Sequence, residues 1–422
     1  MTRLMDYGRI RAALRLSLLG LTAGLLWLTA APAQAADPIK IGFSVQLTGS
    51  LASSGNANLL AQQIWAEEIN AKGGLLGRPV QLVFYDDQTN ASLVPGIYTK
   101  LLDVDKVDLL MGAATNVIVA AMPIIMQRNK LVMTLVALAV NDKFNYPRYF
   151  HSASFGPDAR TVLGESFFEA AMLINPRPQT VALVGADAEF SSNAISGARD
   201  LAKKYNLRIV YDRTYPPSTA DFSPIVRAIQ ATNPDLVFLA SYPIDSAGMV
   251  RAARELGLKT QMFGGAMVGG QYASLRTQLG ENLNRVVNYE LWSPGPKMRF
   301  PGIEEFLAKY QAKAREKGAD PLGYYQPPFS YAAMQVLEQA IKATNSLDDG
   351  KLADYIHKNT FKTVVGDIAF DQRGEWAKPR VLMVQFQNVK GNGIEQFMKE
   401  GTQVVLYPPD YKDGEPQVPF AK

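Results

Sequence analysis

From Ile39 onward, short runs rich in β-branched residues alternate with segments of helical periodicity, and this alternation limits the possible folds more than any other feature of the chain. The pattern is typical of βαβ units, in which crossover helices join parallel strands. The sequence therefore predicts an α/β fold on a mostly parallel sheet. We expect strands at Ile39–Val45, Val80–Tyr85 and Val107–Met111, and helices at Asn56–Ala71, Leu93–Val104 and Val117–Gln127.

The same alternation starts again further along the chain. We expect strands at Thr180–Val184, Leu207–Tyr211 and Asp235–Ala240, and helices near Ser191–Tyr205, Ser223–Ala231 and Ser246–Leu256. The chain has 422 residues, whereas a single hydrophobic core stops growing at roughly 250–300 residues. Two successive blocks in a chain of this length predict two similar lobes, each with its own core.

The first 35 residues have the pattern of a secretory signal peptide. Four arginines between Arg3 and Arg15 precede an apolar stretch from Leu16 to Ala31, and small residues follow at Ala33-Gln34-Ala35. This order of basic, apolar and small residues is typical of an exported chain, and we predict cleavage after Ala35. The alternative, an uncleaved membrane anchor, is less favoured because the apolar stretch is shorter than the ~20 residues of a spanning helix.

Composition excludes several kinds of chemistry. The chain has no cysteine and only two histidines, His151 and His357, so it lacks a thiolate nucleophile and the means for an imidazole-rich or cysteine-ligated metal site. We therefore expect no metal, cofactor or catalytic triad. A bacterial lipoprotein needs a cysteine at its cleavage site, so an exported chain without one is expected free in a Gram-negative periplasm. The net charge of +4 gives no reason to expect a nucleic-acid partner.

Three polar or glycine-rich groups have an ordinary structural interpretation. Asp86-Asp87 could be an acidic pair for catalysis or metal binding, but such pairs more often cap a helix or turn the chain. Gly264-Gly265 with Gly269-Gly270 does not fit a phosphate-loop spacing, and we interpret it as a strand-to-helix loop. His151, at the expected junction of the lobes, is interpreted as a hydrogen-bonding residue rather than a base.

The segment Tyr324–Tyr331 is denser in aromatic residues than the start of a helix requires. Core packing explains some of these rings. Stacking on a ligand is an equally good interpretation, because their hydroxyl groups can also form hydrogen bonds. Both interpretations remain open from sequence alone.

An ordered set of short motifs resembles one family across nearly the whole mature chain. The motifs are Ile39-Lys40-Ile41-Gly42, Leu47-Thr48-Gly49, Gly55, Glu68–Gly74, Tyr85-Asp86-Asp87, Lys106-Val107, Gly112, Asp221-Phe222-Ser223 and Gly257–Thr260. Their order and spacing are similar to those of the branched-chain amino-acid binding proteins of ABC importers. The resemblance implies a type I periplasmic binding fold: two doubly wound parallel-sheet lobes, joined by three crossovers, that close on a ligand in the cleft between them. Lobe one would be residues 36–156 plus 292–381, and lobe two residues 157–291 plus 382–422.

The resemblance places several ligand-binding positions in lobe one. Relatives offer a hydroxyl from the loop after the third strand; here that loop contains Ala114, Thr115 and Asn116, with Asn116 at the hydroxyl position. The positive end of the following helix would still favour an anion or a carbonyl there. A second family hydroxyl, after the fourth strand, falls on Ala139, with Ala137 at the neighbouring backbone position.

The remaining positions come from lobe two and from the aromatic segment. Phe190 lies where relatives often have tyrosine, Tyr242 matches a family tyrosine, and Tyr325 is a candidate stacking residue. Ala266 falls where amino-acid binders place the acidic partner of the α-ammonium. Burying an ammonium without a counter-charge costs several kcal/mol. We therefore expect a small organic carboxylate or amide with an apolar or aromatic body, rather than an ordinary amino acid.

The resemblance implies a transport receptor. Its expected partners are a small-molecule ligand and an ABC permease in the inner membrane, and we expect the receptor to be a monomer. Two alternatives share the fold: a true Leu/Ile/Val-binding protein, and the ligand-sensing subunit of a signalling system. An exported enzyme is a third class, disfavoured because no triad, metal cluster or cofactor loop is found in the sequence.

Overall fold

The computed structural model describes residues 37–421. The predicted signal peptide, residues 1–35, lies outside these described residues. From Ile39 onward the chain forms a single structural unit. None of its described helices has the length and hydropathy that crossing a membrane requires.

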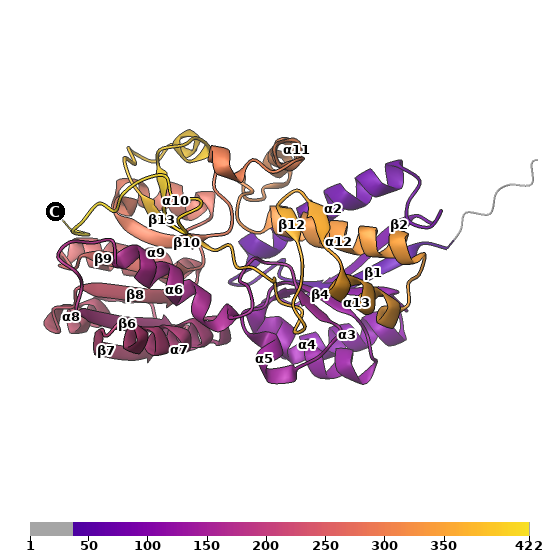
Figure 1. Cartoon of the computed structure of the whole chain (residues 1–422), viewed down its shortest axis with the longest axis horizontal. Coiled ribbons are helices and arrows are strands. Elements are labelled where there is room, and N and C mark those ends of the chain that lie inside the picture. Colours follow the sequence, from indigo (N-terminus) through magenta and orange to yellow (C-terminus); the bar gives the residue numbers. More distant parts are fainter. Residues whose placement is uncertain (1–36, 422) are drawn as a thin grey trace, which may run out of the picture. The chain divides into compact units, whose positions relative to one another are not determined.

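A five-stranded parallel sheet, called here the first sheet, uses the first block of the sequence (Figure 1). Its strand order is β2-β1-β3-β4-β5, and every neighbouring pair is parallel. The strands are β1 (Ile39–Val45), β2 (Val80–Asp86), β3 (Leu109–Ala114), β4 (Val132–Val136) and β5 (Tyr149–His151). The helices between them are α2 (Ala52–Ala71), α3 (Val94–Asp103), α4 (Thr115–Gln127) and α5 (Val140–Phe144).

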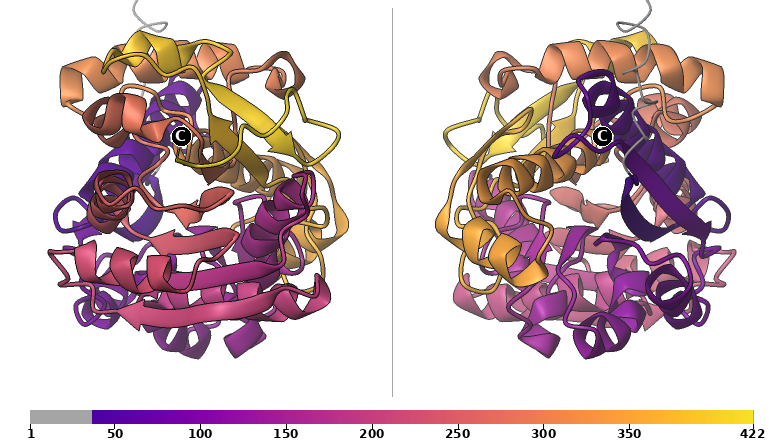
Figure 2. Two further views of the ribbon diagram at one scale, coloured as in Figure 1. Left: turned by 90° about the vertical axis from the view of Figure 1, so that its left-hand side faces the viewer. Right: turned by 90° about the vertical axis from the view of Figure 1, so that its right-hand side faces the viewer.

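The second sheet has seven strands in the order β14-β13-β10-β9-β8-β6-β7. Strands β6 to β10 are parallel, whereas β13 and β14 are antiparallel and come from the end of the chain, drawn in yellow in Figure 2. The strands are β6 (Thr180–Ala186), β7 (Arg208–Tyr215), β8 (Leu236–Ser241), β9 (Met262–Met267), β10 (Val286–Glu290), β13 (Leu382–Phe386) and β14 (Gln403–Tyr407). The helices are α6 (Ala159–Ala171), α7 (Glu189–Lys204), α8 (Ser223–Ala231), α9 (Pro243–Glu255) and α10 (Ala273–Leu279), with 3-10 turns η1 (Gly280–Leu283) and η3 (Ile394–Met398).

The chain passes between the two sheets three times: between β5 and α6, after β10, and before β13. After β10 it forms η2 (Pro296–Met298), α11 (Ile303–Lys317), α12 (Pro327–Thr344), α13 (Asp349–Lys358) and the hairpin β11 (Phe361–Thr363) with β12 (Gly366–Ile368). Helix α12 packs against α2 and β4 of the first sheet. The predicted α/β fold of two doubly wound sheets joined by three crossovers is thereby confirmed.

Helices cover both faces of the first sheet. Its central strands are therefore buried along most of their length, instead of alternating between buried and exposed residues. Helices α2 and α12 lie over one face, and α3 and α4 over the other. The α3–α4 face has its own apolar cluster around Tyr98, Leu110 and Ile125. The opposite face belongs to the larger core that also includes the second sheet.

Helix α2 begins at Ala52, four residues before the expected start at Asn56. The sequence Ser53-Ser54-Gly55 has low helix propensity, so the pattern predicted a later start. Close packing explains the glycine: a Cβ at Gly55 would lie 1.9 Å from the carbonyl oxygen of Gln46. Tertiary contact with the end of β1 therefore outweighs local propensity here.

Two expected loops differ from the structure. No loop separates β3 from α4, because the strand continues through Ala114 and the helix starts at Thr115. The prediction that Gly264-Gly265 belongs to a strand-to-helix loop is wrong, since both residues lie inside β9. A Cβ at Gly264 would lie 1.9 Å from the carbonyl oxygen of Val287 in the neighbouring strand, so this glycine allows close strand packing.

Asp86 and Asp87 organise a turn after β2, as expected. The carboxylate of Asp86 accepts hydrogen bonds from the backbone amides of Leu47 and Gln88, at 3.0 and 2.8 Å. The carboxylate of Asp87 accepts from the Thr89 amide at 2.9 Å and from the Gln46 side chain at 2.6 Å. All of these donors are neutral. Because they come from both segments, the two carboxylates tie the end of β1 to the segment after β2.

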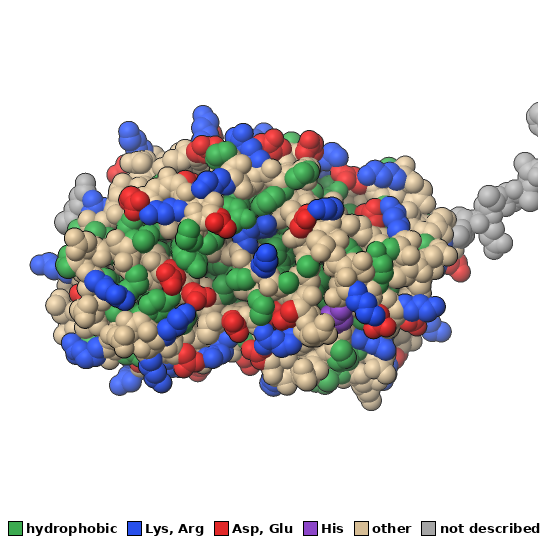
Figure 3. Space-filling model, viewed as in Figure 1, with side chains coloured by type: hydrophobic (Ala, Val, Ile, Leu, Met, Phe, Trp, Pro, Cys, Tyr) green, Lys and Arg blue, Asp and Glu red, His purple; other side chains and the backbone are tan. Residues whose placement is uncertain are grey.

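Basic and acidic side chains are interspersed over the face shown in Figure 3. A nucleic-acid surface is expected to carry a stripe of basic residues. The mixed charges on this face agree with the small net charge of +4.

Candidate functional site

The carboxyl ends of the two sheets meet at a small cavity, called here the inner cavity. Each sheet contains the strand order 2-1-3-4-5, as β2-β1-β3-β4-β5 and as β7-β6-β8-β9-β10. In such sheets ligands bind beyond the carboxyl ends of the strands, at the point where the order reverses. That point lies between β1 and β3 in the first sheet and between β6 and β8 in the second.

The lining of the inner cavity comes from these two points. The first sheet and its helices contribute Leu51, Ser54, Ala114, Thr115, Asn116 and Val136. The second sheet contributes Phe190 at the start of α7, Tyr242 after β8 and Val268 after β9. Tyr325 and Gln326, just before α12, complete the lining.

The first-sheet wall presents the amino end of helix α4. The N-cap residue is Ala114, whose methyl side chain cannot accept a hydrogen bond from the helix. The hydroxyl of Thr115 donates to the Val136 carbonyl at 3.2 Å and accepts from the Leu138 amide at 3.0 Å. Its hydrogen bonds therefore hold the segment after β4. The first backbone N–H groups of α4 have no partner within the helix, and together with the positive helix end they favour a negatively charged or carbonyl oxygen.

Asn116 links the two walls of the cavity. Its Oδ1 atom accepts a hydrogen bond from the Tyr242 hydroxyl at 3.0 Å and one from the Phe190 backbone amide at 3.3 Å. Both donors belong to the second-sheet side, whereas Asn116 is in the first turn of α4. The amino group of Asn116 remains as a further donor of this side chain.

The second-sheet wall is aromatic. The rings of Phe190 and Tyr242 lie edge to face, with centroids 6.2 Å apart. Burial raises the pKa of Tyr242 to about 12, so its hydroxyl stays protonated and can donate. Asp245 fixes this residue by accepting a hydrogen bond from its backbone amide at 2.9 Å and another from the Tyr215 hydroxyl at 2.5 Å.

Hydroxyl and amide groups surround the end of the cavity near α12. The Ser54 hydroxyl is hydrogen-bonded to the Tyr272 hydroxyl, and the Tyr325 hydroxyl to that of Tyr289. Gln326 accepts a hydrogen bond from Asn58 through its Oε1 atom at 2.6 Å. Burial raises the pKa of Tyr325, so this end of the cavity is neutral and rich in donors.

Charged side chains are missing from the lining of the inner cavity. Asp245 is the nearest carboxylate along the Tyr242 segment, and its oxygens already accept from Tyr215 and Tyr242. An ammonium group in this cavity would have no carboxylate among the described lining residues as a direct partner, which is costly in a buried site. Donors are in excess, so the chemistry favours a ligand with acceptor oxygens.

Six of the nine predicted site residues are brought together here: Ala114, Thr115, Asn116, Phe190, Tyr242 and Tyr325 all line the inner cavity. Ala137, Ala139 and Ala266 lie outside its lining. The carbonyl of Ala137 accepts from the Tyr149 hydroxyl at 3.1 Å, and Ala139 begins α5 in a left-handed conformation with φ of 56°. Ala266 is fully buried inside β9, and Val268, two residues later, reaches the cavity instead.

Five lining residues were not predicted from the sequence: Leu51, Ser54, Val136, Val268 and Gln326. Leu51 and Ser54 lie at the start of α2, which the sequence places too late. Val136 and Val268 are apolar residues at strand ends, where composition does not separate a cavity wall from core. Gln326 is next to the predicted Tyr325, and its position in the aromatic segment was the one available signal.

His151 is a buried hydrogen-bonding residue at the crossover after β5, as expected. Its Nδ1 atom lies 2.7 Å from Oε2 of Glu375, and its Nε2 atom accepts the Ala137 backbone N–H at 3.1 Å. Burial raises the pKa of Glu375. The pair ties the segment after β4 to the third crossover, and it occupies the Ala137 amide that the resemblance offered to a ligand.

The aromatic segment divides between core and cavity. Tyr324 packs on Trp292 with centroids 4.8 Å apart, Phe329 on Trp376 at 6.1 Å, and Tyr331 on Phe306 at 4.7 Å. Tyr325 is the ring of this segment that lines the inner cavity. Core packing thus explains most of the aromatic density, and one ring is available to a ligand.

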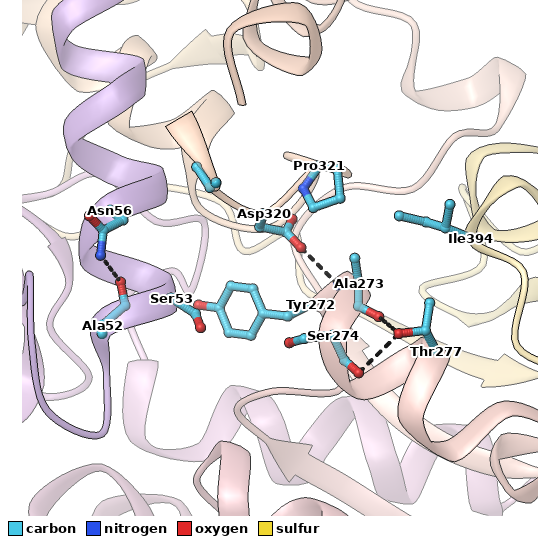
Figure 4. Close-up of a pocket in the computed structure, with 12 residues that line it drawn as sticks. Ala52, Ser53, Asn56, Tyr272, Ala273, Ser274, Thr277, Asp320, Pro321 and Ile394 are labelled. Carbon is cyan, nitrogen blue, oxygen red and sulfur yellow. Dashed lines mark hydrogen bonds between the residues drawn. The ribbon is translucent and has the colours of Figure 1, made fainter. Parts of the chain in front are cut away.

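A second cavity of about 510 Å³, called here the outer pocket, lies between the start of α2 and the start of α10 (Figure 4). Its polar lining includes Ser53, Asn56, Ser274, Thr277 and Asp320. The inner cavity has a volume of only about 20 Å³. In the described part of the chain, no group of three or more His, Cys, Asp or Glu side chains is placed to hold a metal ion.

Residues 38–392 match the sequence model of a family described as periplasmic binding protein. The Leu/Ile/Val-binding protein of Escherichia coli (strain K12) is 24% identical over 357 residues, which cover 84% of this chain and 92% of that relative. A leucine-binding protein from Thermotoga maritima has a similar fold, with a TM-score of 0.71 at 21% identity over 83% of this chain and 96% of the other.

A further solved structure has the same fold and a different kind of ligand. It is the solute-binding protein of an ABC transporter from Rhodopseudomonas palustris BisB5, in complex with 3,4-dihydroxybenzoic acid. Its TM-score is 0.68 at 20% identity, over 84% of this chain and 94% of the other. Similar folds therefore accommodate both amino acids and an aromatic acid.

Proposed function

Because the chain belongs to the periplasmic binding protein family, we propose that it is the solute-binding protein of an ABC importer of the branched-chain amino-acid type. It captures a small organic solute between two lobes and delivers it to a permease in the inner membrane. The lobes are residues 36–156 with 292–381, and residues 157–291 with 382–422. The position of the inner cavity, between the two strand-order reversals, supports this division.

The solute is a carboxylate or amide with an apolar or aromatic body. The observation that carries this proposal is the lining of the inner cavity, which combines the uncapped amino end of α4 with neutral side chains and contains no carboxylate. Oxygen acceptors of the ligand would bind at α4 and Asn116. The rings of Phe190, Tyr242 and Tyr325 would enclose its body.

Binding requires the two walls to move apart and close again. The inner cavity, at about 20 Å³, has room for about one water molecule. A ring-sized ligand enters when the hydrogen bonds between Asn116 and the second-sheet wall open. Hinge closure about a few connecting residues is an established form of ligand-linked motion, and the three crossovers are the segments where the hinge would lie.

The second candidate is a true Leu/Ile/Val-binding protein, which the names of the curated relatives favour. Calorimetric titration with leucine, benzoate and 3,4-dihydroxybenzoate separates the two candidates. We expect either aromatic acid to bind at least tenfold more tightly than leucine, because the cavity offers no partner for an ammonium. Tighter binding of leucine than of both acids would overturn the proposed ligand class.

The natural ligand can be identified directly from the small molecules that the purified protein retains. Mass spectrometry of small molecules released from protein purified from its own host should give a carboxylate or amide of apolar body. An α-amino acid as the main released species would contradict the proposal. Recovery of the released ligand chemically unchanged after incubation would support binding without turnover, whereas conversion to a product would indicate an enzyme.

Export and assembly complete the proposal. We propose that residues 1–35 are removed and that the mature monomer works in the periplasm. The intact mass of the exported protein should correspond to a chain that starts at Ala36. Retention of Met1–Ala35 in the exported protein would contradict cleavage, and a stable dimer in light scattering would contradict the monomer.

A further inference from the structure

The inner cavity and the outer pocket are separated by little more than one side chain. Ser54 lines the inner cavity, and the adjacent Ser53 lines the outer pocket. Tyr272 lines the outer pocket, and its hydroxyl is hydrogen-bonded to the Ser54 hydroxyl. Figure 4 shows the Tyr272 ring extending from the start of α10 toward α2.

The inner side of the same ring contacts the cavity wall. Tyr272 lies edge to face with Tyr325, with ring centroids 5.8 Å apart, and Tyr325 lines the inner cavity. Tyr272 is only 2% exposed. The ring therefore fills the space between a cavity of about 20 Å³ and a pocket of about 510 Å³.

Backbone geometry, rather than the ring alone, places Tyr272 at this position. Its amide donates to the Gly269 carbonyl at 3.0 Å. Gly269 has φ of +116°, and a Cβ there would lie 2.7 Å from Cα of Pro243. A smaller side chain at position 272 would therefore leave the loop in place and open a passage between the two cavities.

The outer pocket has the chemistry of a site for a neutral group. Ser53, Asn56, Ser274 and Thr277 supply uncharged polar atoms. The carboxylate of Asp320 accepts from the backbone amides of Ala273 at 2.8 Å and Gly323 at 2.9 Å. A second anion in this pocket would face that carboxylate, so a neutral distal group fits better.

We propose that Tyr272 is the residue that limits ligand length, and that the outer pocket is an extension subsite for the neutral distal part of a longer ligand. The proposal rests on the proposed function, since it takes the inner cavity as the site of a carboxylate. In the wild-type protein the ring restricts ligands to about the size of one aromatic ring. Removal of the ring joins the two spaces.

The test compares benzoate with biphenyl-4-carboxylate, which has one additional neutral ring. Calorimetry on the wild-type protein should show at least tenfold weaker binding of the biphenyl acid. In Tyr272→Ala, affinity for the biphenyl acid should rise at least tenfold while benzoate affinity changes less than threefold. Tyr272→Leu, a milder change, should show the same direction if Tyr272→Ala does not fold.

Three variants separate the volume of the ring from other effects. Tyr272→Phe keeps the ring but loses the hydrogen bond to Ser54, so its affinity for the biphenyl acid should stay within threefold of wild type. Tyr355→Ala removes a half-buried ring that packs on Phe361, away from both cavities, and should leave both affinities unchanged. Exposed Ser274→Trp, added to the Tyr272→Ala protein, should fill the outer pocket and abolish the gain.

Several results would overturn the inference. Equal binding of both acids to the wild-type protein, or no gain in either Tyr272→Ala or Tyr272→Leu, would show that this residue does not limit length. A gain in Tyr272→Phe as large as in Tyr272→Ala would assign the effect to the hydrogen bond instead. If the variants bind benzoate but gain no affinity for the biphenyl acid, the proposed function stays intact and only the length limit is overturned. If neither the wild-type protein nor any variant binds either acid, both the proposed function and the length limit are overturned.

Discussion

The two sheets share one strand order but supply different chemistry to the site between them. The first sheet contributes the amino end of α4 with Thr115 and Asn116, which is a set of hydrogen-bond donors. The second sheet contributes Phe190 and Tyr242, which are rings. In the proposed function, the same topological position would therefore face the polar end of the ligand on one side and its apolar body on the other.

The two halves also differ in how they bury charge. In the first sheet Asp87 is fully buried with neutral donors only. In the second half Arg276 and Glu290 are both fully buried, with Nη2 of Arg276 2.5 Å from Oε1 of Glu290. The guanidinium also lies 5.2 Å from the ring centre of Phe386, on strand β13. The second core therefore depends on a charge pair that the end of the chain helps to enclose.

The largest expected effect comes from breaking this pair. Above about pH 7, where Glu290 is ionised, Arg276→Met leaves this charge buried without its partner and should lower the free energy of unfolding by about 3–5 kcal/mol. Urea unfolding followed by tryptophan fluorescence measures the loss. Arg160→Met, which breaks the exposed pair with Asp200, is the control and should leave the free energy of unfolding nearly unchanged. A loss below 1 kcal/mol in Arg276→Met would remove the contrast between the two cores.

The next effect tests the donor character of the first-sheet wall. Asn116→Asp keeps an acceptor for Tyr242 and Phe190 but places a negative charge beside the cavity. Affinity for benzoate should fall about a hundredfold, equivalent to about 2.7 kcal/mol, while benzylamine should bind better than to wild type. Calorimetry measures both affinities. Exposed Gln278→Glu is the matched control; an unchanged benzoate affinity in Asn116→Asp would place the carboxylate elsewhere.

A pH dependence should distinguish the second core. Burial raises the pKa of Glu290 to about 7 from an ordinary value of 4.5, and Arg276 partly opposes this. Between about pH 4.5 and 7 the folded state therefore holds a proton that the unfolded state has lost, so stability contributed by this group falls as pH rises. Glu290→Gln should remove a decrease of about 3 kcal/mol across that range. Parallel stability curves of wild type and Glu290→Gln would contradict this assignment.

The smallest effect tests the aromatic wall. Tyr242→Ala should weaken benzoate binding at least tenfold, or about 1.4 kcal/mol, because it removes both a ring and the hydrogen bond to Asn116. Tyr242→Phe keeps the ring and should lose only about threefold. Isothermal titration with Tyr355→Ala as the control measures these changes. An unaltered affinity in Tyr242→Ala would exclude this ring from the site.

Regular elements with strong periodicity were predictable from sequence. Strand β1 occupies the expected residues Ile39–Val45 because its β-branched pattern and the following turn agree. The start of α2 was not predictable, because Gly55 serves a contact with the Gln46 backbone that propensity does not register. The antiparallel strands β13 and β14 also escaped prediction, since pairing across long sequence separation leaves no local signal.

Several predicted site residues that follow a strand line the inner cavity. Asn116, Phe190 and Tyr242 each lie just beyond a strand's carboxyl end, and all three line the inner cavity. Ala266 lies outside the lining because β9 continues to Met267, so that Val268 is the residue at the cavity. The amide of Ala137, which the resemblance offers to the ligand, donates a hydrogen bond to His151, a contact that only the three-dimensional structure reveals.

The late return of the chain to both sheets has a consequence for how the protein is made. The first sheet lacks α12 until residue 344 has been synthesised, and the second lacks β14 until residue 407. Neither core can close while the chain is still emerging, and contacts between such distant residues form slowly. We therefore expect the nascent chain to remain unfolded until its synthesis is nearly finished, a state in which it can still be threaded through a narrow export channel.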